Sequence, residues 1–311
     1  MITNEEHVRV VSWNLEHNGI ERDGTDHRWH LAMDVLAGLR PHILLRQELT
    51  RGHMYGMSAV WAEANRLGGH IPFLARATPE SANPTGVYID RDYFEPVEYY
   101  EHATGMWHPI SNPVVRLKGA PKRLSLASVH MCHFDPDRRL NEARRLTTLG
   151  KPGMAALFGG DFNSYPHAQD EAVSLPDWAE VADSTHFEHR TVDWCGERVS
   201  DSRPDRILAA THYDRPPVFA ELGQFAATRL GQRGALAPTS SLWRKDQGDM
   251  QRIDRIYATP RVAEALISLE VVVNDEIREA SDHCPVMATF SLSRLRHALA
   301  EPPAHAGDAD L

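Results

Sequence analysis

The chain has 311 residues and is 42% hydrophobic, so it can bury a core large enough to fold without disulfides or a structural metal. Its formal net charge of −10 at pH 7 excludes a protein that coats nucleic acid with a uniformly basic surface, although a local basic groove is compatible with it. The three cysteines form no CxxC pair, the N-terminus carries acidic residues where a signal peptide is basic, and no apolar run reaches the ~18 residues of a membrane span. We therefore expect a cytoplasmic protein with no membrane insertion. The sequence does not set its oligomeric state.

The first quarter of the chain alternates strand and helix patterns. Its predicted elements are a strand over 8–13, a polar loop over 16–26, a helix over 27–40, a strand over 42–45 and a helix over 54–67. Pro41 ends the first helix, because the residue before a proline avoids the helical conformation. Gly68 and Gly69 close the second helix.

The middle of the chain is richer in strands. Short strands separated by Pro, Gly and Asn turns are predicted over 73–75, 86–89, 97–101, 114–117 and 124–130. Asp135 followed by Pro136 is typical of a helix start, and this helix is predicted to continue to about residue 149. A buried strand over 154–158 then leads into two glycines and Asp161.

The last part of the chain is the least regular. Residues 167–248 are marked by prolines and contain one predicted helix near 218–230. The closing strands are predicted over 252–257, 267–273 and 285–292. We expect one catalytic domain over 1–296 and a disordered tail over 297–311. Strands and helices in this arrangement predict an α/β (α+β) protein whose two sheets pack face to face with helices outside.

Five short segments each place a polar side chain beside an apolar, strand-like run. They read SWN at 12–14, QE at 47–48, GDFN at 160–163, RIDRI at 252–256 and SDH at 281–283. Polar side chains at the ends of buried strands rarely serve packing. Together they predict a functional site assembled from distant parts of the chain.

Two carboxylates in these segments are candidate ligands of a hard cation. Mg²⁺ needs one or two carboxylates together with waters and substrate oxygens. Glu48 and Asp282 supply that number, and Asn14 either adds a neutral oxygen or orients Glu48. An isolated glutamate at a strand end is usually only a solvated residue, so this prediction depends on the whole set of segments.

The GDFN segment predicts a group that activates water. Two glycines allow a sharp exit from the strand, and the pleat of a strand would place Asp161 and Asn163 on the same side. A carboxylate and a carboxamide so placed can position a water beside a phosphorus atom. A turn rich in Asn and Ser explains residues 163–164 but not an aspartate at the strand end.

The SDH segment predicts a histidine that contacts phosphate. A bend there lets Asp282 face a metal while His283 faces the phosphoryl oxygens, where negative charge accumulates. His283 then needs a carboxylate partner, for which we choose Asp254. Asp205 is a rival, because Asp-Arg-Ile occurs at both places. Asp254 is preferred because it begins a late strand, with room for one further strand before residue 282.

Two further histidines follow the strand predicted over 124–130. We predict that His130 is a phosphate contact or a second acid, and that His133 is structural. The spacing of these two histidines does not match a His-Glu-x-x-His metal motif.

In these residues the chain resembles the endonuclease/exonuclease/phosphatase superfamily, which includes DNase I-like nucleases. The matching motifs are SWN at 12–14, QE at 47–48, VH at 129–130, GGDFNS at 159–164, RIDRIYAT at 252–259 and SDHCPV at 281–286. They appear in the family's order and span about residues 7 to 292. Arg46 departs from the pattern, because family members often have an apolar residue there; it either contacts substrate or forms an ion pair.

The resemblance implies a DNase I-like fold, a four-layer sandwich with two central, mostly antiparallel sheets flanked by helices. It also implies hydrolysis of a phosphoester with Mg²⁺, for which Mn²⁺ can substitute. By this resemblance the metal ligands are Asn14, Glu48 and Asp282. The catalytic residues it implies are His130, Asp161, Asn163, Asp254 and His283.

The substrate class stays open between alternatives. Nucleic acid is the preferred substrate, and it calls for a cationic rim such as the arginines at 138, 139, 144 and 145 or the Trp243-Arg244-Lys245 segment. For the arginine helix, a merely solvated face is the favoured interpretation. A phosphomonoesterase or a sphingomyelinase-like enzyme acting on a small phosphoester or lipid head group is the alternative, and a non-catalytic binding module of the same fold is the third.

Overall fold

Two six-stranded sheets form the centre of the protein, whose computed structural model describes residues 6–168 and 175–300. The first sheet has the strand order β13 (Leu266–Val271), β14 (Val286–Ser291), β1 (His7–Asn14), β2 (Ile43–Gln47), β4 (Gly86–Ile89) and β3 (Ile71–Leu74). The second has the order β11 (Ala220–Glu221), β12 (Asp254–Ala258), β8 (Ala156–Asp161), β7 (Arg123–His130), β6 (Ile110–Leu117) and β5 (Phe94–His102). Both sheets are mixed, since β1 pairs with β2 and β7 pairs with β8 in parallel.

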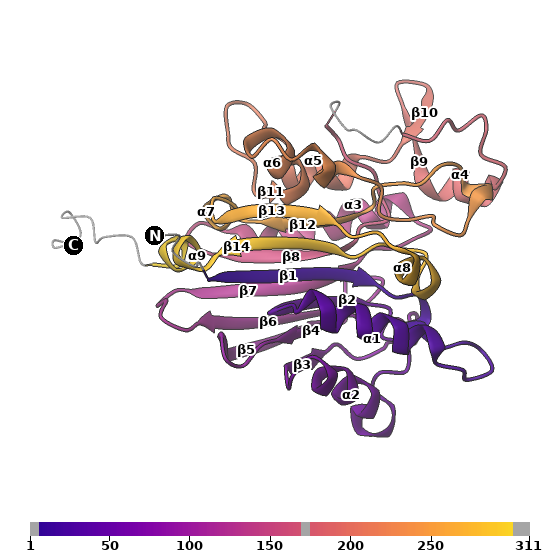
Figure 1. Ribbon diagram of the computed structural model, residues 1–311. Coiled ribbons are helices and arrows are strands. Elements are labelled where there is room, and N and C mark those ends of the chain that lie inside the picture. Colours follow the sequence, from indigo (N-terminus) through magenta and orange to yellow (C-terminus); the bar gives the residue numbers. More distant parts are fainter. Residues whose placement is uncertain (1–5, 169–174, 301–311) are drawn as a thin grey trace.

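Helices cover the outer faces of both sheets (Figure 1). On the first sheet they are α1 (His27–Leu39), α2 (Ser58–Arg66) and α8 (Asp275–Ala280), and on the second α3 (Pro136–Leu146) and α5 (Arg203–Ala209). The remaining helices are α4 (Ser184–Arg190), α6 (Leu222–Arg229), α7 (Pro260–Ala263) and α9 (Leu292–Ala298). The protein therefore has the four-layer arrangement that the sequence motifs imply.

The alternation of side chains along β1, β7, β8 and β12 places polar residues between the sheets. In β1, Val8 and Val10 pack in the core between the sheets, whereas Val11 and Trp13 pack under the helices. Successive side chains of a strand point to opposite faces, so Asn14 lies on the same side as Val8 and Val10. The strand thus brings an amide to the end of the intersheet core.

The second sheet repeats this pattern at the same end of the core. Its inward-facing apolar residues include Leu126 of β7, Leu157 of β8 and Ile256 of β12. Counting in steps of two along each strand brings three polar side chains to that face: His130, Asp161 and Asp254. The register pairs Asp161 with both of the others, His130 on β7 and Asp254 on β12. Three of the predicted site residues therefore lie side by side at one end of the second sheet.

Most predicted elements are confirmed with shifted ends. The predicted helix over 27–40 is α1, and the strand predicted over 114–117 is the last part of β6, which begins earlier, at Ile110. The stretch predicted as a loop over 16–26 begins with a 3₁₀ helix, η1 (Glu16–Gly19). The helix predicted over 54–67 is divided into η2 (Met54–Met57) and α2, because Tyr55, Gly56 and Met57 have positive φ angles.

The irregular stretch over 167–248 contains more structure than its sequence predicts. Besides α6, where a helix is predicted near 218–230, it holds α4, α5, a hairpin of β9 (Thr191–Trp194) and β10 (Glu197–Ser200), and the turns η4 (Arg233–Leu236) and η5 (Lys245–Gln247). These elements are too short for their periodicity to be recognised. At the C-terminus, α9 continues to Ala298, past the predicted start of the tail at 297, and residues 301–311 lie outside the described part. Within the described residues no helix is long and apolar enough to cross a membrane.

A buried ion pair fastens α2 to the first sheet. Arg46 points outward from β2, and its Nε donates to Glu63 Oε1 at 2.8 Å, with both side chains at most 1% exposed. Its other donors reach Asn18 Oδ1 at 2.8 Å and the carbonyl oxygen of Trp13 at 3.1 Å. Of the two roles predicted for Arg46, the structure shows the ion pair.

Substituting Glu63 by Ala is expected to lower the free energy of unfolding by about 3–5 kcal/mol, because it leaves the Arg46 guanidinium buried without its carboxylate. Urea titration of both proteins measures this difference. Glu95→Ala, which breaks the exposed pair with Arg116, is the matched control and is expected to cost about 0–1 kcal/mol. Equal losses in the two variants would contradict the prediction.

Candidate active site

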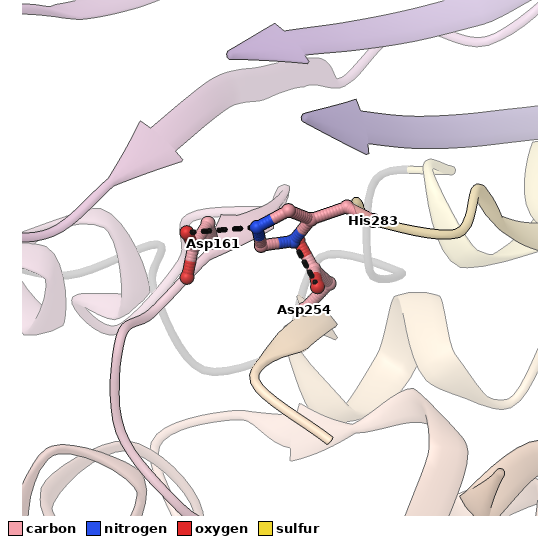
Figure 2. Close-up of side chains that lie close together, drawn as sticks. All are labelled: Asp161, Asp254 and His283. Atoms are coloured by element: carbon pink, nitrogen blue, oxygen red, sulfur yellow. Dashed lines mark hydrogen bonds and ion pairs between the residues drawn. The ribbon is translucent and has the colours of Figure 1, made fainter. Parts of the chain in front are cut away.

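A histidine between two aspartates forms the centre of the site (Figure 2). His283 Nδ1 lies 2.8 Å from Asp254 Oδ2, and His283 Nε2 lies 3.9 Å from Asp161 Oδ2. The first distance is a hydrogen bond and the second is too long for one. His283 Nε2 is therefore not bonded to Asp161 and can donate to a reactant that lies beside both groups. The partner of His283 is Asp254, as predicted.

The rival Asp205 belongs to a different group of residues. Its carboxylate accepts from the backbone N–H of His167 at 2.8 Å and from the hydroxyl of Tyr257 at 2.5 Å. Tyr257 points to the outer face of the second sheet, away from Asp254, because the two residues have opposite parity on β12. The two Asp-Arg-Ile segments therefore lie in different parts of the structure, and of their two aspartates it is Asp254 that contacts His283.

Asn14 connects the carboxylates of the two sheets. Its Nδ2 lies 3.3 Å from Glu48 Oε1 and 3.3 Å from Asp161 Oδ2. Glu48 follows β2 with a left-handed backbone, φ 55°, and its Oε2 accepts the N–H of His17 at 2.9 Å. The structure thus brings together Asn14 of β1, Glu48 just after β2 and Asp161 of β8.

The SDH segment is tied to the end of β1. The indole N–H of Trp13 donates to the carbonyl oxygen of His283 at 2.8 Å, and the hydroxyl of Ser281 donates to the carbonyl oxygen of Asn14 at 2.8 Å. Two segments about 270 residues apart are thereby held in register. This explains how Asp282 and His283, although adjacent, contribute to the same site.

The electrostatic environment favours a charged His283. Burial opposes its charge, but the negative charges of Asp254 and Asp282 outweigh it and raise the pKa of His283 well above 6.5. At Glu48, burial raises the pKa, and the charge of Asp282 adds to this against the hydrogen bond from His17. Positive charge, from a protonated histidine or a bound cation, therefore stabilises the closely spaced carboxylates of this site.

His130 lies beside Asp161, and its ring is part of a stack. Its Nε2 is 3.6 Å from Asp161 Oδ2, and its ring stacks on His108 with centroids 4.0 Å apart. His133 in turn stacks on His108 at 6.0 Å. Burial, together with the charges of His133 and His283, lowers the pKa of His130 well below 6.5. The imidazole is therefore neutral, which suits a phosphate contact better than the second acid.

The predicted placement of Asn163 is wrong. The strand ends at Asp161, so Asn163 lies beyond the pleat in a left-handed turn with φ 49°. Its side-chain Nδ2 donates to the carbonyl oxygen of Met131 at 2.9 Å, and its backbone N–H donates to Asp161 Oδ1 at 2.8 Å. Asn163 therefore holds the Asp161 carboxylate through its backbone.

The segments predicted as a cationic rim mostly have structural partners. In the arginine helix, Arg139 is buried against Asp201, with Nη2 at 3.3 Å from Oδ2, and Arg145 contacts His102 at 3.1 Å. At the other candidate, the indole of Trp243 donates to the carbonyl oxygen of Arg278 at 2.7 Å. These contacts are structural, but the favoured interpretation of the arginine helix as a merely solvated face is wrong for Arg139, which is buried and paired.

Thr239 belongs to the site but was not predicted. Its hydroxyl donates to Asp254 Oδ2 at 2.7 Å, the oxygen that also contacts His283. The backbone N–H of Asp254 donates back to the same hydroxyl at 3.0 Å. A lone threonine in an irregular segment has no motif that would identify it.

Two sets of residues offer ligands to a metal. One ligand atom each of Asp161, Asp254 and His283 lies within 4.8 Å of the others, but the His283–Asp254 hydrogen bond already uses two of these groups. In the second set, Asn14 Oδ1 and Asp282 Oδ1 are buried and have no hydrogen-bond partner among the described residues. Unpaired buried oxygens of this kind fit a hard cation such as Mg²⁺.

The buried His108 is expected to make the protein sensitive to acid. Burial and the charges of His130 and His133 lower the pKa of His108 well below 6.5, so the unfolded chain takes up a proton near that pH and the folded chain does not. Stability from this residue is present above about pH 6.5 and is lost as the pH falls. Between pH 8 and pH 5.5 the free energy of unfolding should fall by about 1 kcal/mol less in His108→Phe than in the wild type. Denaturant titrations at the two pH values measure this. The exposed His53→Asn serves as the control, and equal losses in His108→Phe and the wild type would contradict the prediction.

Comparison with known proteins adds evidence on the fold. No family model matches the chain, and no curated protein matches it in sequence. Among solved structures, an endonuclease/exonuclease/phosphatase from Bacteroides vulgatus is 14% identical with a TM-score of 0.61, covering 92% of this chain and 99% of its own. D. rerio TDP2 complexed with a single-strand DNA product is 16% identical with a TM-score of 0.58, covering 92% and 98%. ANGEL2, a 2′,3′-cyclic phosphatase, is 12% identical with a TM-score of 0.59, covering 93% and 96%. The chain thus has the fold of the endonuclease/exonuclease/phosphatase superfamily.

Proposed function

We propose that this protein is a divalent-metal-dependent hydrolase that cleaves phosphodiester bonds, with nucleic acid as its substrate. The observation that carries the proposal is the pair of groups facing one another across 3.9 Å, Asp161 Oδ2 and His283 Nε2, with Asp254 behind the histidine. A carboxylate that accepts a proton and an imidazolium that donates one are the two groups that hydrolysis of a phosphoester needs.

Each of these side chains has a role that follows from its contacts. Asp161 orients a water and accepts its proton through Oδ2, while the N–H of Asn163 holds Oδ1. His283, kept charged by Asp254, donates Nε2–H to a phosphoryl oxygen as negative charge develops there. His130, neutral and 3.6 Å from Asp161, provides a further N–H to the phosphate.

Asn14, Glu48 and Asp282 are the residues that would hold Mg²⁺, with Mn²⁺ as its substitute. All three offer oxygen atoms, and two of these atoms are buried without a hydrogen-bond partner in the described part of the chain. When bound, the ion would act as a Lewis acid on a phosphoryl oxygen. Asn14 Nδ2 meanwhile donates toward Asp161 and so keeps that carboxylate oriented.

The preference for nucleic acid rests on the relatives of the same fold. TDP2 is complexed with a single-strand DNA product, and ANGEL2 is complexed with adenosine-2′,3′-vanadate. A mannosyl-6-phosphatase shares the fold as well, so the fold alone does not select the substrate. The substrate is therefore the part of the proposal that most needs an assay.

Asp161→Asn is expected to lower nicking of supercoiled plasmid by at least about 100-fold in the presence of Mg²⁺ or Mn²⁺, because the variant lacks the proton acceptor. Gel analysis of the purified proteins measures the rate. The exposed Asp92→Asn carries the same change in charge and should keep the wild-type rate. Nicking by Asp161→Asn at the wild-type rate would refute the assigned role. If neither protein nicks plasmid although metal is bound, the substrate is a smaller phosphoester.

Asp282→Asn is expected to weaken binding of Mn²⁺ by at least about tenfold, because it removes a carboxylate whose buried oxygen has no hydrogen-bond partner among the described residues. Electron paramagnetic resonance of free Mn²⁺ measures this without any substrate. His283→Gln removes the one histidine of the alternative set and should leave the Mn²⁺ affinity within a few-fold. The reverse result would place the metal on Asp161, Asp254 and His283 instead.

A further inference from the structure

Arg190, the last residue of α4, is a buried cation. It is 9% exposed, and its Nη1 has no hydrogen-bond partner in the described part of the chain. Across residues 6–168 and 175–300, no carboxylate forms an ion pair with it. Buried arginines are ordinarily paired, because removing an unpaired charge from water is costly. Arg190 therefore has the capacity to bind an anion that the protein itself does not supply.

The neighbours of Arg190 add positive charge. Burial, and after it the charge of Arg190, lower the pKa of Arg139 to about 10. The nearby carboxylate of Asp201 is shared, at 3.3 Å from Arg139 Nη2 and 2.9 Å from Arg203 Nε. Arg139 Nε and Arg203 Nη2 are also buried without a hydrogen-bond partner in the described structure. Two guanidinium groups thus share the Asp201 carboxylate and Arg203 also pairs with Asp137 at 3.0 Å, whereas no carboxylate of the described residues pairs with Arg190.

A row of aromatic and imidazole rings, here called the ring wall, connects this place to the active site. It consists of His130, His108, His133, Phe134 and His189. It begins at His130, whose Nε2 is 3.6 Å from Asp161, and it ends at His189, the residue before Arg190. The charge of Arg190 acts on both His130 and His133. Arg190 therefore lies near the site, on the side of the ring wall.

The position of Arg190 differs from that of the reacting phosphate. His283 contacts Asp254 at 2.8 Å and lies 3.9 Å from Asp161. The reacting phosphorus would lie beside Asp161 and His283, whereas Arg190 follows His189 at the far end of the ring wall. An anion at Arg190 would therefore be a second group of the same substrate.

We propose that Arg190 binds a second phosphate of the substrate, adjacent to the phosphate that is cleaved, and so selects substrates with consecutive phosphates. This inference rests on the proposed hydrolysis of phosphoesters at Asp161 and His283. The planar guanidinium matches phosphate oxygens in a bidentate manner. Three rings of the ring wall, those of His133, Phe134 and His189, are exposed or partly exposed and can stack against the nucleoside between the two phosphates.

A structural role at the helix end does not explain the same observations. Basic side chains near the C-terminus of a helix interact favourably with its dipole, and an exposed arginine serves this purpose. Such a role gives no reason to bury Nη1 without an acceptor. It also does not explain why Arg139 Nε and Arg203 Nη2, beside Asp201, are buried without a hydrogen-bond partner in the described residues.

The test compares substrates with one phosphate and with several. Bis(p-nitrophenyl) phosphate carries one, and a single-stranded tetranucleotide carries three consecutive phosphodiesters. Arg190→Gln is expected to lower kcat/KM for the tetranucleotide by at least about tenfold, mainly through KM, because a charge-assisted phosphate contact is lost. Turnover of the small substrate should stay within twofold. Arg190→Lys keeps the charge but not the planar guanidinium, so its kcat/KM for the tetranucleotide should lie between those of the wild type and Arg190→Gln. The exposed Arg206→Gln should match the wild type.

Binding provides a readout that does not depend on hydrolysis. In Asp161→Asn protein, fluorescence anisotropy with a labelled tetranucleotide should show at least about tenfold weaker binding when Arg190→Gln is added. If the wild type cleaves neither substrate but binding still depends on Arg190, the proposed function fails and the second phosphate site stands. An equal loss on both substrates, or no loss in either cleavage or binding, would overturn the inference.

Thermal unfolding separates this role from a purely structural one. Removing an unpaired buried charge should leave the unfolding temperature of Arg190→Gln unchanged or higher. Inorganic pyrophosphate should raise the unfolding temperature of the wild type and not that of the variant. A large drop in the unfolding temperature, with no difference in the response to pyrophosphate, would assign Arg190 to folding.

Discussion

The crowding of buried carboxylates at the ends of two sheets is the constraint on which this site depends. Asp161 and Asp254 are buried close together, and the partly buried Glu48 is joined to Asp161 through the amide of Asn14. Like charges in a desolvated place are tolerated only with donors or cations between them. Asn14 and His283 supply those donors from the first sheet, and the proposed metal supplies the rest.

Because of this constraint, the two sheets must be held in a fixed position relative to each other. The bond from Asn14 to Asp161 crosses from one sheet to the other, and the contacts of Trp13 and Ser281 fix the SDH segment against β1. Behind these contacts lies the apolar core between the sheets, which holds the strands in register. Precision at the site is therefore a property of the whole sandwich.

Charge is distributed unevenly around this centre. Carboxylates gather at Glu48, Asp161 and Asp282, whereas unpaired guanidinium donors gather around Asp201. The ring wall lies between them, and burial favours the neutral form of its histidines. A phosphate chain that follows the ring wall would meet the catalytic groups at one end and positive charge at the other. The negative net charge of the chain is thus compatible with an anionic substrate.

The sequence by itself determined the polar residues that come together at strand ends, because each of them lies beside an apolar, strand-like run. Asn14, Asp161, Asp254 and His283 were identified in this way, and the contact between His283 and Asp254 is confirmed. What only the tertiary structure decided depends on contacts with no local pattern. The turn at Asn163, the hydroxyl of Thr239 and the unpaired guanidinium of Arg190 lie in or beside irregular segments. A residue's neighbours in such segments are set by the packing of the whole chain, so neither periodicity nor spacing predicts them.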